Sequence, residues 1–443
     1  MRWLSTRGSA PPATFREALF AGLAPDGGLY LPERLDPLPP ATFDPSSEST
    51  LTDIALAVAA HLIEDEIPRG ALEAIVRSAL DFPIPLVRVA AAGCESPGSD
   101  VLALELFHGP TLAFKDVGAR VMARLMAHFT DTHSPLTVLV ATSGDTGSAV
   151  ARAFAGVPGT RVVVLFPEGQ VSDVQEAQFA TVGGNVEAVA VAGTFDDCQA
   201  LVKTAFADGA LRRDVRLSSA NSINVGRLLP QVFYYVWAGV QLGRLKPPRR
   251  NVVMSVPSGN FGNLTAGLVA KRLGLQVARF VAATNVNDVV PEYLRSGRYV
   301  PRASVRTVAN AMDVGAPSNF ERIRALYGDS LDRLRTDLTG AAFDNAAVTR
   351  AIADVYRDHR YLLDPHSAIA WLGLQTALVS HRDATGVLLA TAHPAKFRET
   401  VEPAIGASID LPAPLADALQ QPRFVTRLNA DYSMLRDLLA ARV

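Results

Sequence analysis

The chain has 443 residues, of which 49% are hydrophobic and 19% charged, and this length predicts two or three domains rather than one core. The 42 basic and 44 acidic residues leave a formal net charge of −2, which excludes a broad basic surface for nucleic acid. No apolar run is long enough to span a bilayer, so we expect no membrane partner.

Residues 1–100 are expected to form a distinct N-terminal domain. Helical patterns cover residues 52–63 and 70–80, and no residue of this range has an obvious chemical role. The N-terminus lacks the apolar core of a secretory signal. Two cysteines, Cys94 and Cys198, lie too far apart to indicate a disulfide framework or a cysteine-based metal site. We therefore expect a cytoplasmic protein and no metal.

From Val101 onward, continuous apolar runs alternate with helical patterns. The predicted strands are 101–106, 136–141, 161–166, 186–191, 216–220, 252–256 and 387–390, and helices are expected from Asp116 and from Ser148, among others. Continuous rather than alternating apolar strands with helical crossovers indicate parallel sheets that are covered on both faces. The fold class is therefore predicted to be α/β.

Lys115 lies between the first of these strands and the helix that follows it, in the sequence Phe107-His108-Gly109-Pro110-Thr111-Leu112-Ala113-Phe114-Lys115-Asp116. A lysine that is placed between apolar residues after Gly-Pro is poorly positioned for solvation. Burial would lower its pKa and leave a neutral amine that can attack a carbonyl. Taken alone, such a lysine is more often one that snorkels to the surface.

Three polar loops follow predicted strands and precede predicted helices, which is where ligand sites of such folds lie. They are the 142–147, 221–227 and 258–263 loops. Exposed backbone N–H groups and the positive end of a helix favour an anion at such a place. The 258–263 loop suits a phosphate, the hydroxyl-rich 142–147 loop suits a carboxylate, and Arg227 suits a second phosphate. Each loop is also compatible with an ordinary turn, a helix cap or a surface ion pair.

Taken together, these motifs resemble the threonine synthase family, in the longer form found in many bacteria and fungi. The matching segments occur in the family's order: 22–29, 107–116, 141–149, 222–231, 258–263 and 391–397. The resemblance covers nearly the whole chain. It implies the tryptophan synthase β-like fold (fold type II) of enzymes that use pyridoxal 5′-phosphate, with two unequal α/β domains and an N-terminal domain. It predicts a large domain made of residues 101–115 and 211–443, and a small domain made of residues 116–210.

The resemblance also implies roles for individual residues. Lys115 would bind the cofactor covalently and then move protons between Cα, Cβ and Cγ of the substrate. The residues implied to bind the cofactor are Ser258, Gly259, Asn260, Phe261, Gly262 and Asn263 at its phosphate, Thr391 at the pyridine nitrogen, and Asp145. The residues implied to bind the substrate are Thr142, Ser143 and Thr146 at its carboxylate, and Asn221, Ser222, Asn224 and Arg227 at its phosphate.

The implied reaction converts O-phospho-L-homoserine and water to L-threonine and phosphate. Many relatives in the wider fold group have asparagine where this chain has Asp145, so the role of Asp145 beside the cofactor's 3′-oxygen stays open, as do the roles of His108, His366 and His393. Two alternatives remain: another elimination enzyme such as threonine dehydratase, or a non-catalytic relative that binds the cofactor or phosphorylated metabolites. By analogy with the longer members, we expect a monomer or a weak homodimer.

Overall fold

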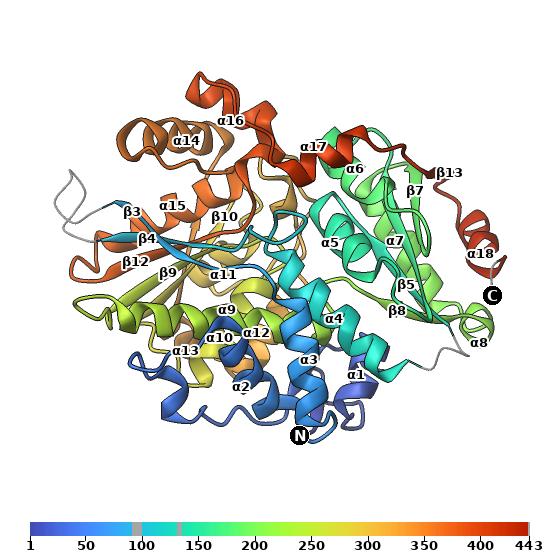
Figure 1. Cartoon of the computed structure of the whole chain (residues 1–443), viewed down its shortest axis with the longest axis horizontal. Coiled ribbons are helices and arrows are strands. Elements are labelled where there is room, and N and C mark those ends of the chain that lie inside the picture. Colours follow the sequence, from blue (N-terminus) through green and yellow to red (C-terminus); the bar gives the residue numbers. More distant parts are fainter. Residues whose placement is uncertain (91–99, 131–134, 442–443) are drawn as a thin grey trace.

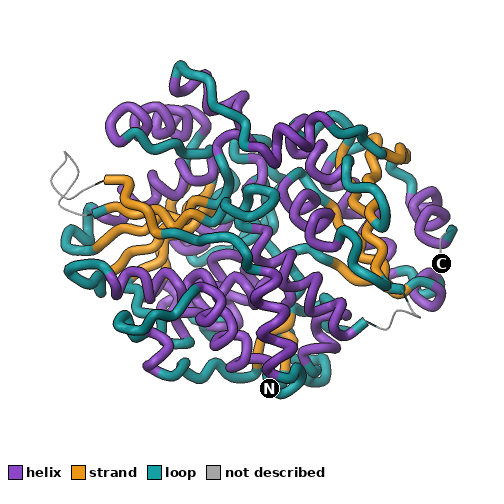
Figure 2. Tube along the Cα trace, in the orientation of Figure 1, coloured by secondary structure: helices purple, strands orange, loops and turns teal. Residues whose placement is uncertain are grey.

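The computed structural model describes residues 1–90, 100–130 and 135–441, so Cys94 lies outside the described part of the chain. Its strands form a two-stranded, a six-stranded and a five-stranded sheet. The two larger sheets lie toward opposite sides of the molecule, and helices α4 (Lys115–Phe129) and α5 (Asp145–Phe154) lie between them (Figure 1). Figure 2 shows the same separation as two groups of strands surrounded by helices.

The six-stranded sheet has the strand order β11-β10-β9-β12-β4-β3. Its strands are β3 (Leu86–Ala90), β4 (Val101–Glu105), β9 (Val252–Pro257), β10 (Arg279–Thr284), β11 (Leu338–Ala342) and β12 (Thr385–Ala390). All neighbours are parallel except β3 and β4. Helices α9 (Val225–Arg244) and α10 (Gly262–Arg272) share a core with one face, and α14 (Asn345–His359) and α15 (Pro365–Leu378) share a core with the other.

The five-stranded sheet is parallel throughout and has the order β13-β7-β6-β5-β8. Its strands are β5 (Leu136–Ala141), β6 (Thr160–Pro167), β7 (Val186–Ala192), β8 (Arg216–Ser219) and β13 (Val425–Asn429). One face packs with α4, α5 and α6 (Asp173–Ala180), and the other packs with α7 (Phe195–Ala207) and α18 (Tyr432–Ala440).

The continuous apolar strands are explained by these two covered faces. Val138 and Val140 of β5 belong to the core that contains α4 and α5, whereas Leu139 and Ala141 belong to the core that contains α7. Successive side chains of a strand point to opposite faces, so a strand that is covered on both sides is predominantly apolar along its whole length. The predicted α/β class with parallel-type sheets is confirmed.

The N-terminal segment contributes β1 (Trp3–Ser5), β2 (Tyr30–Pro32), α1 (Phe15–Ala21), α2 (Leu51–Ile63) and α3 (Arg69–Ala79). Strands β1 and β2 pair antiparallel, and α2 packs against α9 of the large sheet. Helices α2 and α3 begin within a residue of the predicted positions. The remaining helices are α8 (Leu211–Asp214), α11 (Val289–Ser296), α12 (Phe320–Leu326), α13 (Leu331–Asp337), α16 (Arg398–Ile405) and α17 (Ala413–Gln420).

The division of the chain between the two sheets differs from the predicted boundary at residue 211. Both β8 and β13 come from the range that was assigned to the large domain, but they pair in the five-stranded sheet. The polypeptide therefore stays with the smaller sheet through β8 and, after the strands β9 to β12 of the larger sheet, returns to it once with β13; its last helix, α18, packs there (Figure 1). Among the residues that the structure describes, no helix has both the length and the apolar character that a membrane span requires.

Candidate active site

Lys115 is the first residue of α4 and ends a tightly bonded loop after β4. The Asp116 carboxylate closes this loop by accepting hydrogen bonds from the Thr111 backbone N–H at 2.9 Å and the Thr111 hydroxyl at 2.7 Å. A Cβ atom on Gly109 would lie 2.5 Å from the Asp116 carboxylate, so only glycine fits there. These contacts fix the direction in which the chain enters α4.

A segment after β12 holds the same loop from its other side. Ala113 forms an antiparallel bridge with Ala392, the Phe114 N–H donates to the Thr391 carbonyl at 2.8 Å, and the His393 N–H donates to the Leu112 carbonyl at 3.0 Å. Leu112 adopts a left-handed backbone conformation with φ of 57°. Thr391 and Lys115, which are far apart in the sequence, are therefore brought to one place.

The Lys115 ammonium lies in a surrounding that disfavours its charge. Its side chain keeps some accessible surface, but protein encloses it on most sides, and this burial lowers its pKa to about 8. The negative charge of Asp145 opposes the shift, while the positive charges of Arg227 and Lys396 add to it. A lysine with this pKa has an appreciable neutral fraction near neutral pH, as the nucleophilic role requires.

The 142–147 loop connects β5 to α5, which begins at Asp145, three residues before the predicted start. The Thr142 hydroxyl accepts hydrogen bonds from the backbone N–H groups of Gly144 at 3.0 Å and Gly147 at 2.8 Å. Thr142 thus braces its own loop. The side chains of Ser143 and Thr146 are partly exposed and are the hydroxyls of this loop that remain accessible.

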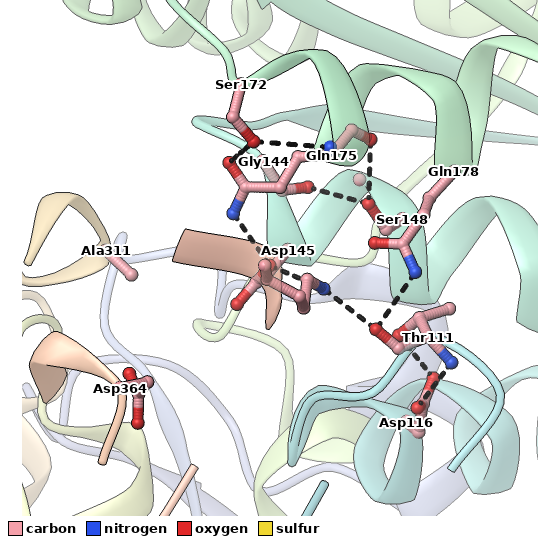
Figure 3. Close-up of polar contacts among 12 residues, drawn as sticks. Thr111, Asp116, Gly144, Asp145, Ser148, Ser172, Gln175, Gln178, Ala311 and Asp364 are labelled. Atoms are coloured by element: carbon pink, nitrogen blue, oxygen red, sulfur yellow. Dashed lines mark hydrogen bonds and ion pairs between the residues drawn. The ribbon is translucent and has the colours of Figure 1, made fainter. Parts of the chain in front are cut away.

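Asp145 is buried and forms an ion pair with Lys396, with 2.7 Å between the carboxylate and the ammonium. Gln175 also donates to Asp145, at 2.8 Å (Figure 3). Burial by itself would raise the pKa of Asp145, but the positive charges of Lys396 and Lys115 hold it well below its usual range. Sequence reasoning did not assign a role to Lys396, although the residue lies within the matching 391–397 segment.

Lys396 has a second partner in the loop that precedes Lys115. Its ammonium donates to the Thr111 carbonyl at 2.8 Å, and this carbonyl also accepts from the Gln178 amide at 3.0 Å. Gln175 and Gln178 belong to α6, on the five-stranded sheet, whereas Lys396 follows β12 of the six-stranded sheet. A polar network thus joins the two halves of the molecule at the loop that precedes Lys115 (Figure 3).

The 258–263 loop lies between β9 and α10. Phe261 adopts a left-handed conformation with φ of 63°, and no side chain caps the helix that starts at Gly262. The first N–H groups of a helix have no partner within it, so this end provides donors for an anion. A Cβ atom on Gly259 would lie 2.6 Å from the Ala311 carbonyl oxygen, so this position accepts only glycine.

Asn263 and Arg227 present buried donors. The Asn263 side-chain oxygen accepts hydrogen bonds from Tyr234 and Tyr235, both at 2.7 Å, which orients its amide nitrogen. That nitrogen and the Arg227 Nε have no hydrogen-bond partner among the described residues. Arg227 donates through Nη1 to the Ala220 carbonyl at 2.5 Å, and burial lowers its pKa to about 10, so it stays charged at neutral pH.

A hydrogen bond joins two of the three polar loops directly. The Asn260 amide of the 258–263 loop donates to the Ser222 hydroxyl of the 221–227 loop at 2.6 Å. The fully buried Arg322, which sequence reasoning missed, donates to the carbonyls of Ile223 at 2.7 Å and Tyr30 at 3.0 Å. Its remaining contacts include the Asn319 side-chain oxygen at 2.6 Å. Arg322 thus fastens the 221–227 loop to the N-terminal segment.

Asn221 and Asn224 tie the 221–227 loop to neighbouring segments of the chain. The Asn221 amide donates to the Ala141 carbonyl at 3.1 Å. The Asn224 oxygen accepts from the Gly226 N–H at 2.8 Å and caps α9, while its amide donates to the carbonyls of Leu19 and Ser219. Asn224 therefore shapes the start of α9, and Arg227 supplies the charge.

Three histidines near the site have polar partners of their own. His366 pairs with Asp364 at 2.7 Å, and its Nε2 accepts from the Ala311 N–H at 3.3 Å, so it supports the wall that contacts Gly259. Asp364 caps α15. His108 bonds to Glu105 at 2.8 Å, and burial lowers the pKa of His393.

These features fit pyridoxal phosphate. Its aldehyde requires an amine that can be neutral, and the enclosed Lys115 has a lowered pKa. Its phosphate requires hydrogen-bond donors, and these are the uncapped start of α10, beside a glycine that admits no side chain, and the buried Asn263 amide without a partner among the described residues. The chain matches the family described as pyridoxal-phosphate dependent enzyme over residues 78–391. Fold and site thus define an enzyme of the pyridoxal-phosphate-dependent class with fold type II. Residues 2–80 match the threonine synthase N terminus, and residues 367–439 match its C-terminal region. The chain belongs to the threonine synthase family.

Individual relatives agree with this assignment. The threonine synthase of Escherichia coli is 44% identical, and that of Haemophilus influenzae is 45% identical, each over 96% of both chains. The crystal structure of the E. coli enzyme superimposes with a TM-score of 0.91 at 42% identity and full coverage of both chains. The pyridoxal-phosphate-bound threonine synthase from Brucella melitensis gives the same TM-score at 38% identity, also with full coverage. The chain is a pyridoxal-phosphate-dependent lyase with threonine synthase activity, and its cofactor is pyridoxal phosphate.

Proposed function

We propose that the chain converts O-phospho-L-homoserine and water to L-threonine and inorganic phosphate. The proposal rests mainly on the direct link between the 221–227 and 258–263 loops, in which the Asn260 amide donates to the Ser222 hydroxyl at 2.6 Å. The 221–227 loop also contains the buried, positively charged Arg227. One loop serves the cofactor phosphate and the other serves the substrate phosphate. A substrate without a phosphate group would give the second loop no anion to bind.

Lys115 is the residue that moves protons in this proposal. Bound pyridoxal phosphate supplies an electron sink for the pair that remains when a proton leaves the substrate's Cα. The neutral Lys115 amine takes protons from Cα and Cβ and returns one to Cγ after phosphate has left that carbon. Water then adds its hydroxyl group at Cβ and gives its remaining proton to the released phosphate, and the second proton returns from Lys115 to Cα, so that the product is threonine. The lowered pKa of Lys115 supports this exchange because donor and acceptor forms are both populated.

The other residues bind and orient. Ser258, Gly259, Asn260, Phe261, Gly262 and Asn263 would hold the cofactor phosphate, mainly through backbone N–H groups, and Thr391 would face the pyridine nitrogen. Ser143 and Thr146 hold the substrate carboxylate on a loop that Thr142 braces. Arg227 holds the substrate phosphate, aided by Asn221 and Ser222, while Asn224 fixes the start of α9.

The direct test is the formation of threonine and phosphate from O-phospho-L-homoserine by the cofactor-loaded protein. We expect both products in equal amounts, and none from a Lys115→Ala variant. Cofactor-loaded protein that forms no threonine would contradict the proposal. Release of ammonia from threonine without use of the phosphate ester would favour a dehydratase instead.

The expected setting is the cytoplasm, and the expected assembly is a monomer or a weak homodimer. Sedimentation of the cofactor-loaded protein over a series of concentrations measures the second expectation. A concentration-independent dimer would contradict it.

A further inference from the structure

The ion pair between Lys396 and Asp145 connects two parts of the active site that the proposed roles leave separate. Lys396 is 1% exposed and Asp145 is 5% exposed, and their charged atoms lie 2.7 Å apart. The Lys396 ammonium also donates to the Thr111 carbonyl, and the Asp145 carboxylate also accepts from Gln175. Both charges are therefore held in one geometry away from water.

The pair lies within the set of charges that face Lys115. Asp145 on α5 favours the protonated form of Lys115, whereas Arg227 on α9 and Lys396 after β12 disfavour it. Asp116, at the start of α4, accepts a hydrogen bond from Thr111, and burial raises its pKa against the lowering effect of the positive charge of Lys396. A buried carboxylate needs a nearby counter-charge. If Lys396 were neutral, the Lys115 ammonium would be the cation left to balance Asp145.

We propose that Lys396 is a positioning residue that occupies the Asp145 carboxylate and so keeps Lys115 available as a neutral amine for the cofactor. The inference rests on the proposed function, because it takes Lys115 as the residue that binds the cofactor. It gives Asp145 the role of an electrostatic partner of two lysines. Lys396 acts through Asp145 and through the Thr111 carbonyl, which belongs to the loop that precedes Lys115.

The two single substitutions should have opposite effects on Lys115. In Lys396→Met, Asp145 keeps its charge and pairs with Lys115, so attachment of the cofactor requires a higher pH. In Asp145→Asn, Lys115 loses its favourable anion, so attachment proceeds at a lower pH. In the double variant both charges are absent, and the pH dependence returns toward that of the unmodified protein. A merely structural pair would not produce shifts of opposite sign.

The experiment measures the rate at which cofactor-free protein attaches pyridoxal phosphate over a series of pH values. In this step the neutral Lys115 amine bonds to the aldehyde carbon and water is released. Borohydride reduction makes the bond permanent, and mass spectrometry of the Lys115 peptide quantifies it. The matched control is Lys271→Met, which removes the ammonium of a second lysine–aspartate pair, with Asp337 at 2.7 Å, away from this site.

We expect the pH of half-maximal rate to rise by about one unit in Lys396→Met and to fall by about one unit in Asp145→Asn. Lys396→Arg and Lys271→Met should both keep the original profile. Shifts of the same sign in the two single variants, or no shift beyond that of Lys271→Met, would overturn the inference. Should Lys396→Met fail to fold, the double variant decides, because its half-maximal pH must lie above that of Asp145→Asn.

Absence of any Lys115 adduct in the unmodified protein would overturn both this inference and the proposed role of Lys115, whereas an adduct with unmoved profiles would overturn this inference alone.

Discussion

The 142–147 and 258–263 loops have similar sequences but different internal bonding. Each follows a buried parallel strand and opens a helix, β5 to α5 in one case and β9 to α10 in the other. In the first loop the Thr142 hydroxyl accepts from two backbone N–H groups. In the second, the Ser258 hydroxyl donates away from the helix, to the Val256 carbonyl at 2.9 Å, and no side chain caps α10.

This difference separates a braced loop from one that is ready to bind an anion. Helix N-termini are stabilised when an acceptor satisfies their first N–H groups, and a side chain or a ligand can supply that acceptor. Where the side chain supplies it, as at Thr142, ligand recognition falls to neighbouring hydroxyls. Where none does, as at Gly262, a phosphate fits. Gly-rich composition and position after a strand are the same in both cases.

The largest effect on activity is expected from substitution of Lys115, which is proposed to bind the cofactor held by the 258–263 loop and to act on the substrate held by the 142–147 loop. Lys115→Ala should lower kcat by at least about 10³-fold, because both proton transfer and covalent attachment are lost. The cofactor should still bind through the 258–263 loop but be removable by dialysis. The exposed Lys203 provides the control, since Lys203→Ala should change neither property. A variant that keeps the cofactor covalently attached would show that another lysine has this role.

The 221–227 loop differs from both because it contains a buried, positively charged side chain, that of Arg227. Arg227→Met should raise KM for O-phospho-L-homoserine about 100-fold, because a charge-assisted contact to phosphate contributes about 1.5–3 kcal/mol. Inhibition by inorganic phosphate should weaken in parallel. Arg250→Met, at an exposed position, is the control. An unchanged KM would contradict a phosphate site in the 221–227 loop.

Gly259→Ala tests the loop that lacks a side-chain cap. The added methyl group would lie 2.6 Å from the Ala311 carbonyl oxygen and 2.8 Å from the Met312 Cα, both backbone atoms. Overpacking of this kind costs about 1–3 kcal/mol, so the Kd for pyridoxal phosphate should rise about 10-fold or more. Titration of the cofactor-free protein measures it. Gly70→Ala, which meets no atom within 4 Å, should leave the Kd unchanged, and equal affinities in the two variants would contradict a tight cradle at Gly259.

The sequence predicted the features that local pattern determines. Runs such as 136–141 and 252–256 are apolar except for the buried Thr137 and Ser255 because both faces of their sheets are covered, and these strands lie where they were expected. The start of α5 was misplaced at Ser148, and this concealed that Asp145 lies in the first turn of a helix. Burial of that carboxylate depends on the packing of α6 and of the segment after β12, which no local pattern reports.

Long-range pairs account for the residues that were missed. Lys396 contacts Asp145 and Thr111, and Arg322 contacts Tyr30 and Ile223, all across large separations in the chain. A lysine or arginine is usually a surface residue, so its type alone does not indicate burial. The pairing of β8 and β13 in the five-stranded sheet was missed for the same reason, because pairing between strands that are distant in the chain leaves no signal in either strand alone.

The smallest effect distinguishes a loop brace from a substrate ligand at Thr142. Thr142→Val removes the acceptor of the Gly144 and Gly147 N–H groups and should lower the free energy of unfolding by about 1–2 kcal/mol, as measured in urea. KM should rise less than about threefold, because the partly exposed Ser143 and Thr146 are proposed to hold the carboxylate. Thr142→Ser keeps the hydroxyl and should match the unmodified protein in both measurements. Unchanged stability with a KM raised about tenfold would make Thr142 a ligand and would contradict the contrast between a braced and an unbraced loop.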